Sequence, residues 1–186
     1  FIPGELNALI NEGDISLLGH VATSIFACMF LHGSWAHLLG NMWSLWLFGD
    51  NVEDKIGKIN FLLFYLLSGV AASLVHFFVN MNSDLPVIGA SGAIAGVMGA
   101  YVLMFPLAKI VTLIPIIWIP LFFRIPAFIF IGLWFFLQVF LGVSELATTQ
   151  VAGGVAWWAH IGGFLFGAVM VRLYKRGGLN DRKYYY

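Results

Sequence analysis

The chain has 186 residues, of which 61% are hydrophobic and only 10% are charged, and its mean hydropathy is +0.92. These values lie outside the range of soluble globular domains, so lipid must be the main solvent of the protein. The formal net charge is zero and no basic run precedes the C-terminal end, so nothing indicates a nucleic-acid-binding surface.

The N-terminal part of the chain is more polar than the stretches that follow it. Residues 1–19 include glycines, a proline and three acids, which predicts a polar lead-in rather than a signal peptide. Because Phe1 is not an initiator methionine, we expect the chain to be a fragment or a processed product. The stretch 20–33 is apolar but too short to span a bilayer, so it is expected to be a buried or interfacial segment.

Long stretches with few charged residues follow. A bilayer core needs about 20 mostly apolar residues per helix, and five stretches meet this requirement. They are residues 34–52, 59–79, 89–108, 126–143 and 156–174. Residues 110–125 are also apolar, but two prolines interrupt them and Arg124 needs water nearby, so a buried or interfacial segment is expected there too. The sequence therefore predicts an all-α membrane protein, a polytopic helix bundle with five visible spans.

The positive charges all lie toward one side of the predicted spans. Segments 1–33, 80–88 and 144–155 contain no Lys or Arg. All nine basic residues instead lie at the end of the first, third or fifth span or after it: Lys55, Lys58, Lys109, Arg124, Arg172, Lys175, Arg176, Arg182 and Lys183. Cytoplasmic loops of membrane proteins are enriched in Lys and Arg. The pattern therefore predicts an integral protein with a cytoplasmic C-terminus.

A few polar side chains lie within the spans, where they are functional candidates because lipid makes them unfavourable. They are His37 and Asn41 in the first span, His76 in the second, Ser91 in the third and His160 in the fifth. Taken singly, each has a structural explanation. The histidines and Asn41 can form hydrogen bonds between helices, and the small residues around Ser91 can serve close helix packing.

Considered together, these residues favour a catalytic site over purely structural roles. Ser91 and His160 each lie early in a span that enters from the side without Lys or Arg, and each lies on or beside a stripe of small residues that lets helix backbones approach. A serine beside a histidine is an activatable nucleophile. His37 and Asn41 share a helix face at the same side and can donate hydrogen bonds to an oxyanion. Four polar groups are thus expected at one depth, near the outer face.

Three segments in this order, residues 32–42 (HGSWAHLLGNM), 89–92 (GASG) and 159–163 (AHIGG), together with Gly49, Glu53, Gly57 and Gly167, form a specific pattern. It resembles that of the rhomboid intramembrane serine proteases. The resemblance implies that Ser91 is the nucleophile and His160 the general base. It also implies that His37, Asn41 and the Ser91 backbone N–H form the oxyanion hole, and that Glu53 is structural.

The resemblance also implies a domain organisation. Residues 1–176 would form a single rhomboid-like domain that lacks the first of six core helices, and residues 177–186 a short polar tail. Two positions depart from the family pattern. Ala95 stands where some members have an aromatic residue that supports the histidine, and residues 1–36 hold no arginine where many members have a Trp-Arg pair. No acidic residue lies deep in a span, so packing is expected to hold His160.

The expected reaction is cleavage of transmembrane segments of other membrane proteins by a Ser-His dyad, without cofactor or metal, in a site open to the extracytoplasmic side. A zinc protease would need a His-Glu-x-x-His helix and an aspartyl protease a pair of intramembrane aspartates, and the sequence has neither. Two alternatives stay open: an inactive rhomboid-like protein that binds membrane clients, and a structural subunit of a membrane complex.

Overall fold

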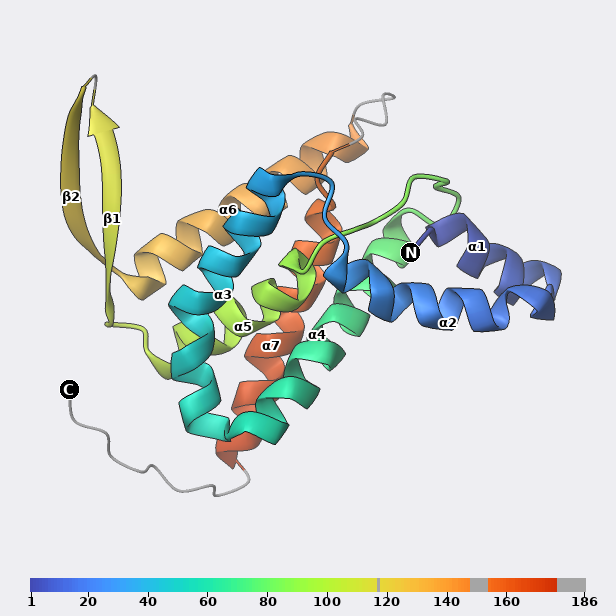
Figure 1. The fold of residues 1–186 in the computed structure, drawn as a ribbon, viewed down its shortest axis with the longest axis horizontal. Coiled ribbons are helices and arrows are strands. Elements are labelled where there is room, and N and C mark those ends of the chain that lie inside the picture. The colour runs from blue at the N-terminus through green and yellow to red at the C-terminus, as the bar shows by residue number, and fades with distance from the viewer. Residues whose placement is uncertain (117, 148–153, 177–186) are drawn as a thin grey trace.

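The computed structural model describes residues 1–116, 118–147 and 154–176, which form a mainly helical protein (Figure 1). The predicted tail 177–186 lies outside the described residues. The elements in chain order are α1 (Pro3–Asn7), the π-helical turn η1 (Ala8–Glu12), the 3₁₀ turn η2 (Ile15–Leu17), α2 (Leu18–Ala27), the 3₁₀ turn η3 (Cys28–Phe30), α3 (Trp35–Ile56), α4 (Lys58–Val79), α5 (Ser91–Met104), β1 (Lys109–Ile116), β2 (Ile119–Pro126), α6 (Ala127–Leu146) and α7 (Trp157–Arg176).

Each of the five predicted spans overlaps one of the helices α3 to α7. By length and composition alone, α4 and α6 can each cross a membrane. The pair Ile15–Phe30 and Trp35–Ile56 is a third candidate if it counts as one span, although its halves meet at 80°. α5 is a shorter apolar helix of 14 residues. The described part of the chain is thus a helical membrane bundle, and the number of five spans stays a prediction.

The stretch expected to be a buried or interfacial segment at 110–125 forms an antiparallel hairpin, the one departure from an all-helical fold among the described residues. Lys109 pairs with Pro126 at its base and Ile116 with Ile119 near its tip. Pro115 and Pro120 stand opposite each other and disfavour a helix, while the many Ile, Val and Phe residues favour strands. The hairpin projects away from the helices (Figure 1).

α5 is the central helix of the bundle, and every residue from Gly92 to Tyr101 is buried. It packs most closely on α7. A Cβ at Gly163 would overlap the carbonyl oxygen of Gly92, and a Cβ at Gly167 would overlap that of Gly96. The two backbones therefore touch directly, which only glycine permits at these positions. The expectation that the small-residue stripes bring two helices together is confirmed.

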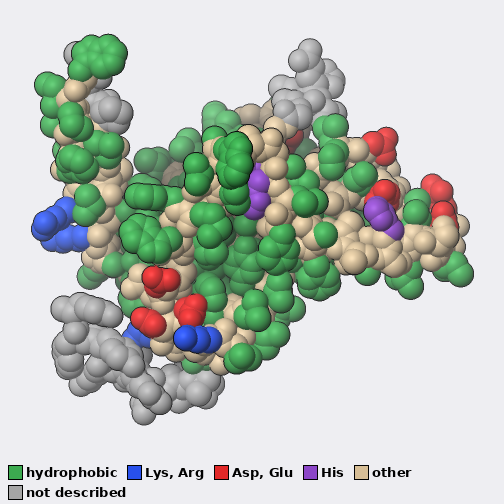
Figure 2. Space-filling view, viewed as in Figure 1, with side chains coloured by type: hydrophobic (Ala, Val, Ile, Leu, Met, Phe, Trp, Pro, Cys, Tyr) green, Lys and Arg blue, Asp and Glu red, His purple; other side chains and the backbone are tan. Residues whose placement is uncertain are grey.

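The surface agrees with a lipid environment. Hydrophobic side chains cover most of the face shown in Figure 2, and acidic and basic side chains gather where α3 meets α4. Large side chains such as Trp43, Leu63 and Phe136 are more than half exposed. An apolar surface of this extent is unusual for a soluble monomer but suits the hydrocarbon core of a bilayer.

Candidate active site

Ser91 is the first residue of α5, and the loop that leads into it is firmly held. The backbone N–H of Gly89 donates to the Cys28 carbonyl at 2.8 Å, and that of Val87 donates to the Phe1 carbonyl at 2.8 Å. Gly89 has a φ of +117°, which residues with a Cβ rarely adopt. Because the first N–H groups of a helix have no acceptor within it, backbone donors lie next to the Ser91 hydroxyl.

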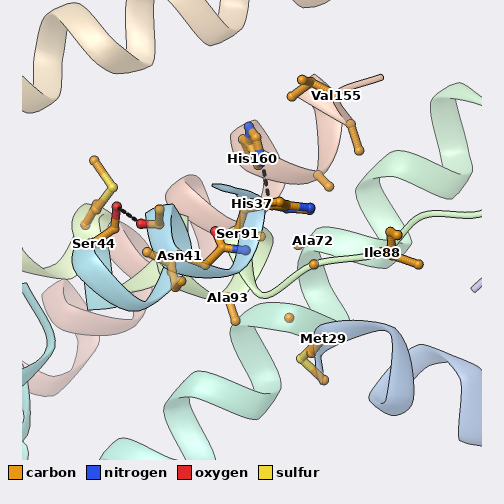
Figure 3. A pocket seen from close by; sticks show the side chains of 18 of the residues that line it. Met29, His37, Asn41, Ser44, Ala72, Ile88, Ser91, Ala93, Val155 and His160 are labelled. Atoms are coloured by element: carbon orange, nitrogen blue, oxygen red, sulfur yellow. Dashed lines mark hydrogen bonds between the residues drawn. The ribbon is translucent and has the colours of Figure 1, made fainter. Parts of the chain in front are cut away.

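His160 lies in the first turn of α7, and its Nε2 is 2.8 Å from Ser91 Oγ (Figure 3). This is a normal hydrogen-bond distance. The close contact between α5 and α7 through Gly92 and Gly163 places the starts of both helices side by side. The structure therefore brings together the two residues that were predicted to act as nucleophile and base.

The other ring nitrogen of His160 has a partner that sequence reasoning missed. Nδ1 lies 2.8 Å from Oε1 of Gln138 in α6, and Nε2 of Gln138 donates to the Trp134 carbonyl at 3.3 Å. Gln138 is 6% exposed and His160 is 9% exposed. The signal that could have found Gln138 is that it is the one polar side chain in the predicted span 126–143.

Aromatic rings complete the surroundings of the imidazole. The centroid of the Trp134 ring lies 5.9 Å from that of His160 at an interplanar angle of 36°, and Trp157 approaches edge-on at 6.4 Å. Ala95 provides no aromatic ring against His160, so the aromatic contacts to the imidazole come from Trp134 on α6 and Trp157 on α7. Packing does hold His160, as expected, but a side-chain hydrogen bond holds it as well.

His37 and Asn41 lie one turn apart on α3 and face the loop before Ser91. A Cβ at Gly89 would lie 2.6 Å from His37 Nε2 and 3.6 Å from Asn41 Nδ2. Asn41 is 8% exposed, and its Nδ2 is buried with no hydrogen-bond partner among the described residues. The Ser34 side chain caps α3 by accepting from the His37 N–H at 3.1 Å, which sets where the helix begins.

A cavity of about 560 Å³ lies among helices α3 to α7, and all four predicted site residues line it: Ser91, His160, His37 and Asn41 (Figure 3). His76, the remaining polar candidate, is not among the described residues that line this cavity. Within the described residues, no group of three or more His, Cys, Asp or Glu side chains is arranged to hold a metal ion. The cavity thus combines a serine, two histidines and an amide donor that has no partner among the described residues.

Comparisons with known proteins identify the family of the chain. A family model of the Rhomboid domain matches residues 8–177. Rhomboid protein 1, mitochondrial, of Saccharomyces cerevisiae is 30% identical over 150 residues, which is 78% of this chain and 40% of that protein. Presenilin-associated rhomboid-like protein A, mitochondrial, of Danio rerio is 31% identical over 147 residues, 74% of this chain and 34% of that protein.

RHOMBOID-like protein 4 of Arabidopsis thaliana is 31% identical over 169 residues, 85% of this chain and 36% of that protein. The match therefore spans well under half the length of each of these relatives. Nearly all of this chain, in contrast, is covered by the family model. The chain belongs to the rhomboid family, whose members are generally intramembrane serine proteases.

Proposed function

We propose that the protein is an intramembrane serine endopeptidase that cleaves transmembrane segments of other membrane proteins. The observation that carries this proposal is the 2.8 Å contact between Ser91 Oγ and His160 Nε2 in a cavity within the helical bundle. A hydroxyl that donates to an imidazole nitrogen can lose its proton as it attacks. Membership of a family of serine proteases supports the same reaction.

The reaction proceeds through an acyl-enzyme. Ser91 Oγ attacks the scissile carbonyl carbon while His160 Nε2 takes the hydroxyl proton. The tetrahedral intermediate then breaks its C–N bond, and His160 delivers the proton to the leaving amine. A water molecule that gives its proton to His160 attacks the resulting ester, and the proton returns to Ser91 as the ester breaks. One peptide bond is hydrolysed by one water, so no cofactor is needed.

The oxyanion that forms in both steps needs hydrogen-bond donors. Asn41 Nδ2 is suited to this role because it is buried without a partner among the described residues and gains one when a substrate oxygen enters. His37, one turn away on the same helix face, and the backbone N–H of Ser91 are the other donors that we assign to the oxyanion hole.

The substrate must reach this site with its backbone accessible. A transmembrane helix shields its peptide bonds, so it has to unwind locally, which Gly or Pro near the cleavage site would ease. The helices α3, α5 and α7 begin beside the cavity and end where the basic residues lie. With those residues on the cytoplasmic side, the cavity opens to the extracytoplasmic side and the C-terminus is cytoplasmic.

Labelling by a fluorophosphonate tests the proposed function directly. We expect the purified protein to be modified at Ser91, because His160 activates that hydroxyl. His160→Ala should lose the label. His76→Ala is the matched control and should keep it, since it removes another intramembrane histidine that does not line the cavity. In-gel fluorescence and mass spectrometry of the modified peptide are the measurements. Equal labelling of wild type and His160→Ala would refute the proposal, whereas a client-binding protein would not react.

The oxyanion hole leads to a second test. Asn41→Ala should lower turnover of a transmembrane substrate by about 10²–10³-fold without abolishing it, since it removes one of several donors. If His37 and Asn41 serve one oxyanion, His37→Ala/Asn41→Ala should lose less than the product of the two single losses. Ser44→Ala is the control on the same helix. Ser44 also lines the cavity, but its hydroxyl already donates to the Gly40 carbonyl at 2.9 Å.

Initial rates of the purified variants on one substrate, with thermal unfolding measured alongside, provide the comparison. Full activity of Asn41→Ala would remove Asn41 from the oxyanion hole and return it to a packing role. A strong loss in Ser44→Ala would mean that the rates report the integrity of α3 rather than the donors.

A further inference from the structure

The proposed mechanism places a strict demand on His160. A neutral imidazole carries one proton, so one ring nitrogen donates and the other accepts. To take the Ser91 proton, Nε2 must be the acceptor, and Nδ1 must therefore carry the hydrogen. In triad proteases a buried aspartate selects this form by accepting from Nδ1–H. No acidic residue lies deep within the predicted spans here, so another group must do so.

The amide of Gln138 faces Nδ1, and its orientation follows from its own hydrogen bonds. Nε2 of Gln138 donates to the Trp134 carbonyl, which can only accept. This bond turns Oε1 toward His160 Nδ1 at 2.8 Å. A flipped amide would set an oxygen against the Trp134 carbonyl oxygen and lose that bond. Oε1 can only accept, so Nδ1 must donate to it.

The result is one directed chain of hydrogen bonds. Ser91 Oγ–H donates to His160 Nε2, His160 Nδ1–H donates to Gln138 Oε1, and Gln138 Nε2–H₂ donates to the Trp134 carbonyl. In this arrangement each of the three groups, the Ser91 hydroxyl, His160 Nδ1–H and the Gln138 amide nitrogen, donates to an acceptor. The tautomer that satisfies the whole chain is the one that a general base at Nε2 requires.

Burial makes this contact hard to replace. Gln138 and His160 are both more than nine-tenths buried, so water cannot readily take the place of the amide. A polar side chain in a membrane helix is unfavourable unless it is hydrogen-bonded. Gln138 is not among the described residues that line the cavity. It contacts His160 at Nδ1, the ring nitrogen on the side away from Ser91.

From these observations we infer that Gln138 is a positioning residue that fixes the tautomer and orientation of His160, an inference that rests on the proposed protease function. Gln138 is neutral, unlike the aspartate of a triad. It selects the correct tautomer but adds no negative charge to stabilise the imidazolium that forms during the reaction. This difference predicts distinct effects on activity for Gln138→Leu and Gln138→Glu.

Gln138→Leu replaces the acceptor with an apolar side chain of comparable size. We expect kcat to fall by about tenfold or more, below the roughly 10⁴-fold cost of losing the triad aspartate's acceptor in serine proteases, with KM little changed. Gln138→Glu keeps an oxygen against Nδ1 and should retain more activity than Gln138→Leu. Its carboxylate stabilises the protonated imidazole, so the acid limb of the pH–rate profile should move to higher pH.

The comparison holds the other charges near the imidazole constant. The titratable groups that act on His160 from neighbouring helices are His37 on α3 and His76 on α4, and both stay in place in these variants. Ser144→Ala is the matched control on α6. It removes a side-chain bond to the carbonyl four residues earlier, here Phe140 at 2.7 Å, of the kind that Gln138 makes to Trp134. It should leave kcat and the pH profile unchanged.

A second measurement does not depend on activity. The ¹⁵N chemical shifts of the His160 imidazole should show the proton on Nδ1 in the wild-type protein and a mixture of tautomers in Gln138→Leu. A wild-type spectrum with the proton on Nε2, or wild-type kcat and pH profile in Gln138→Leu, would overturn the inference. If the wild-type protein is not labelled by the fluorophosphonate, the proposed protease function is overturned instead. Failure of the Gln138 inference and failure of the proposed function are therefore distinguishable. If Gln138→Leu does not fold, Gln138→Glu and the wild-type spectrum decide.

Discussion

Replacing Ser91 by alanine is expected to abolish detectable proteolysis while the protein still folds. The substitution removes one oxygen atom, the one that forms the acyl-enzyme bond in the proposed mechanism. Other groups in the cavity can still orient a peptide and accelerate its hydrolysis slightly. The uncatalysed reaction is so slow, however, that this residual acceleration yields no detectable product. Ser91 makes no capping bond that α5 needs, since the N-cap residue is Ala90.

The measurement is cleavage of a transmembrane substrate by wild type and Ser91→Ala in liposomes, together with their thermal unfolding. A similar midpoint of unfolding and no product in the variant are the expected results. The variant should also still bind the substrate, which crosslinking can detect. Product formed by Ser91→Ala at the wild-type rate would place the nucleophile elsewhere, and an unfolded variant would show that Ser91 has a structural role.

A side chain at Gly163 or Gly167 is expected to have the largest effect on stability. A Cβ at either position would overlap a backbone carbonyl oxygen of α5, at Gly92 or Gly96. A backbone atom cannot move aside as a flexible side chain can, so the two helices must separate. Overpacking usually costs about 1–3 kcal/mol, and we expect Gly167→Val to lie at or above the upper end.

The same separation should disable the site, because His160 lies in the first turn of α7 and Ser91 is the first residue of α5, so moving the two helices apart moves the base away from the nucleophile. Thermal unfolding and fluorophosphonate labelling of Gly163→Val and Gly167→Val measure both effects. Gly132→Ala on α6 and Gly40→Ala on α3 are the controls, since nothing lies within 4 Å of a Cβ at these positions. A Gly167→Val variant as stable and as reactive as wild type would contradict the direct contact of the backbones.

Much of the fold follows from local patterns in the sequence. Apolar stretches long enough to span a bilayer predicted where helices α3 to α7 lie. This worked because helix formation in a membrane depends on the hydropathy of a stretch of about 20 residues, which is a local property of the sequence. The spacing of Gly163 and Gly167 likewise predicted a helix face for close packing. Ser91, His160, His37 and Asn41 were identifiable because a polar residue stands out against an apolar span. Their catalytic roles stay a prediction.

These sequence patterns could not predict which side chains of different helices are in contact. The sequence by itself determined that His160 lies in a membrane helix, but the tertiary structure decided that Gln138 meets its Nδ1 and that Trp134 covers its ring. It also decided that residues 109–126 pair as a hairpin, where apolar composition alone left the conformation open. The physical reason is that periodicity assigns a residue to a face of its own helix, whereas the rotation and placement of neighbouring helices depend on packing across the whole bundle.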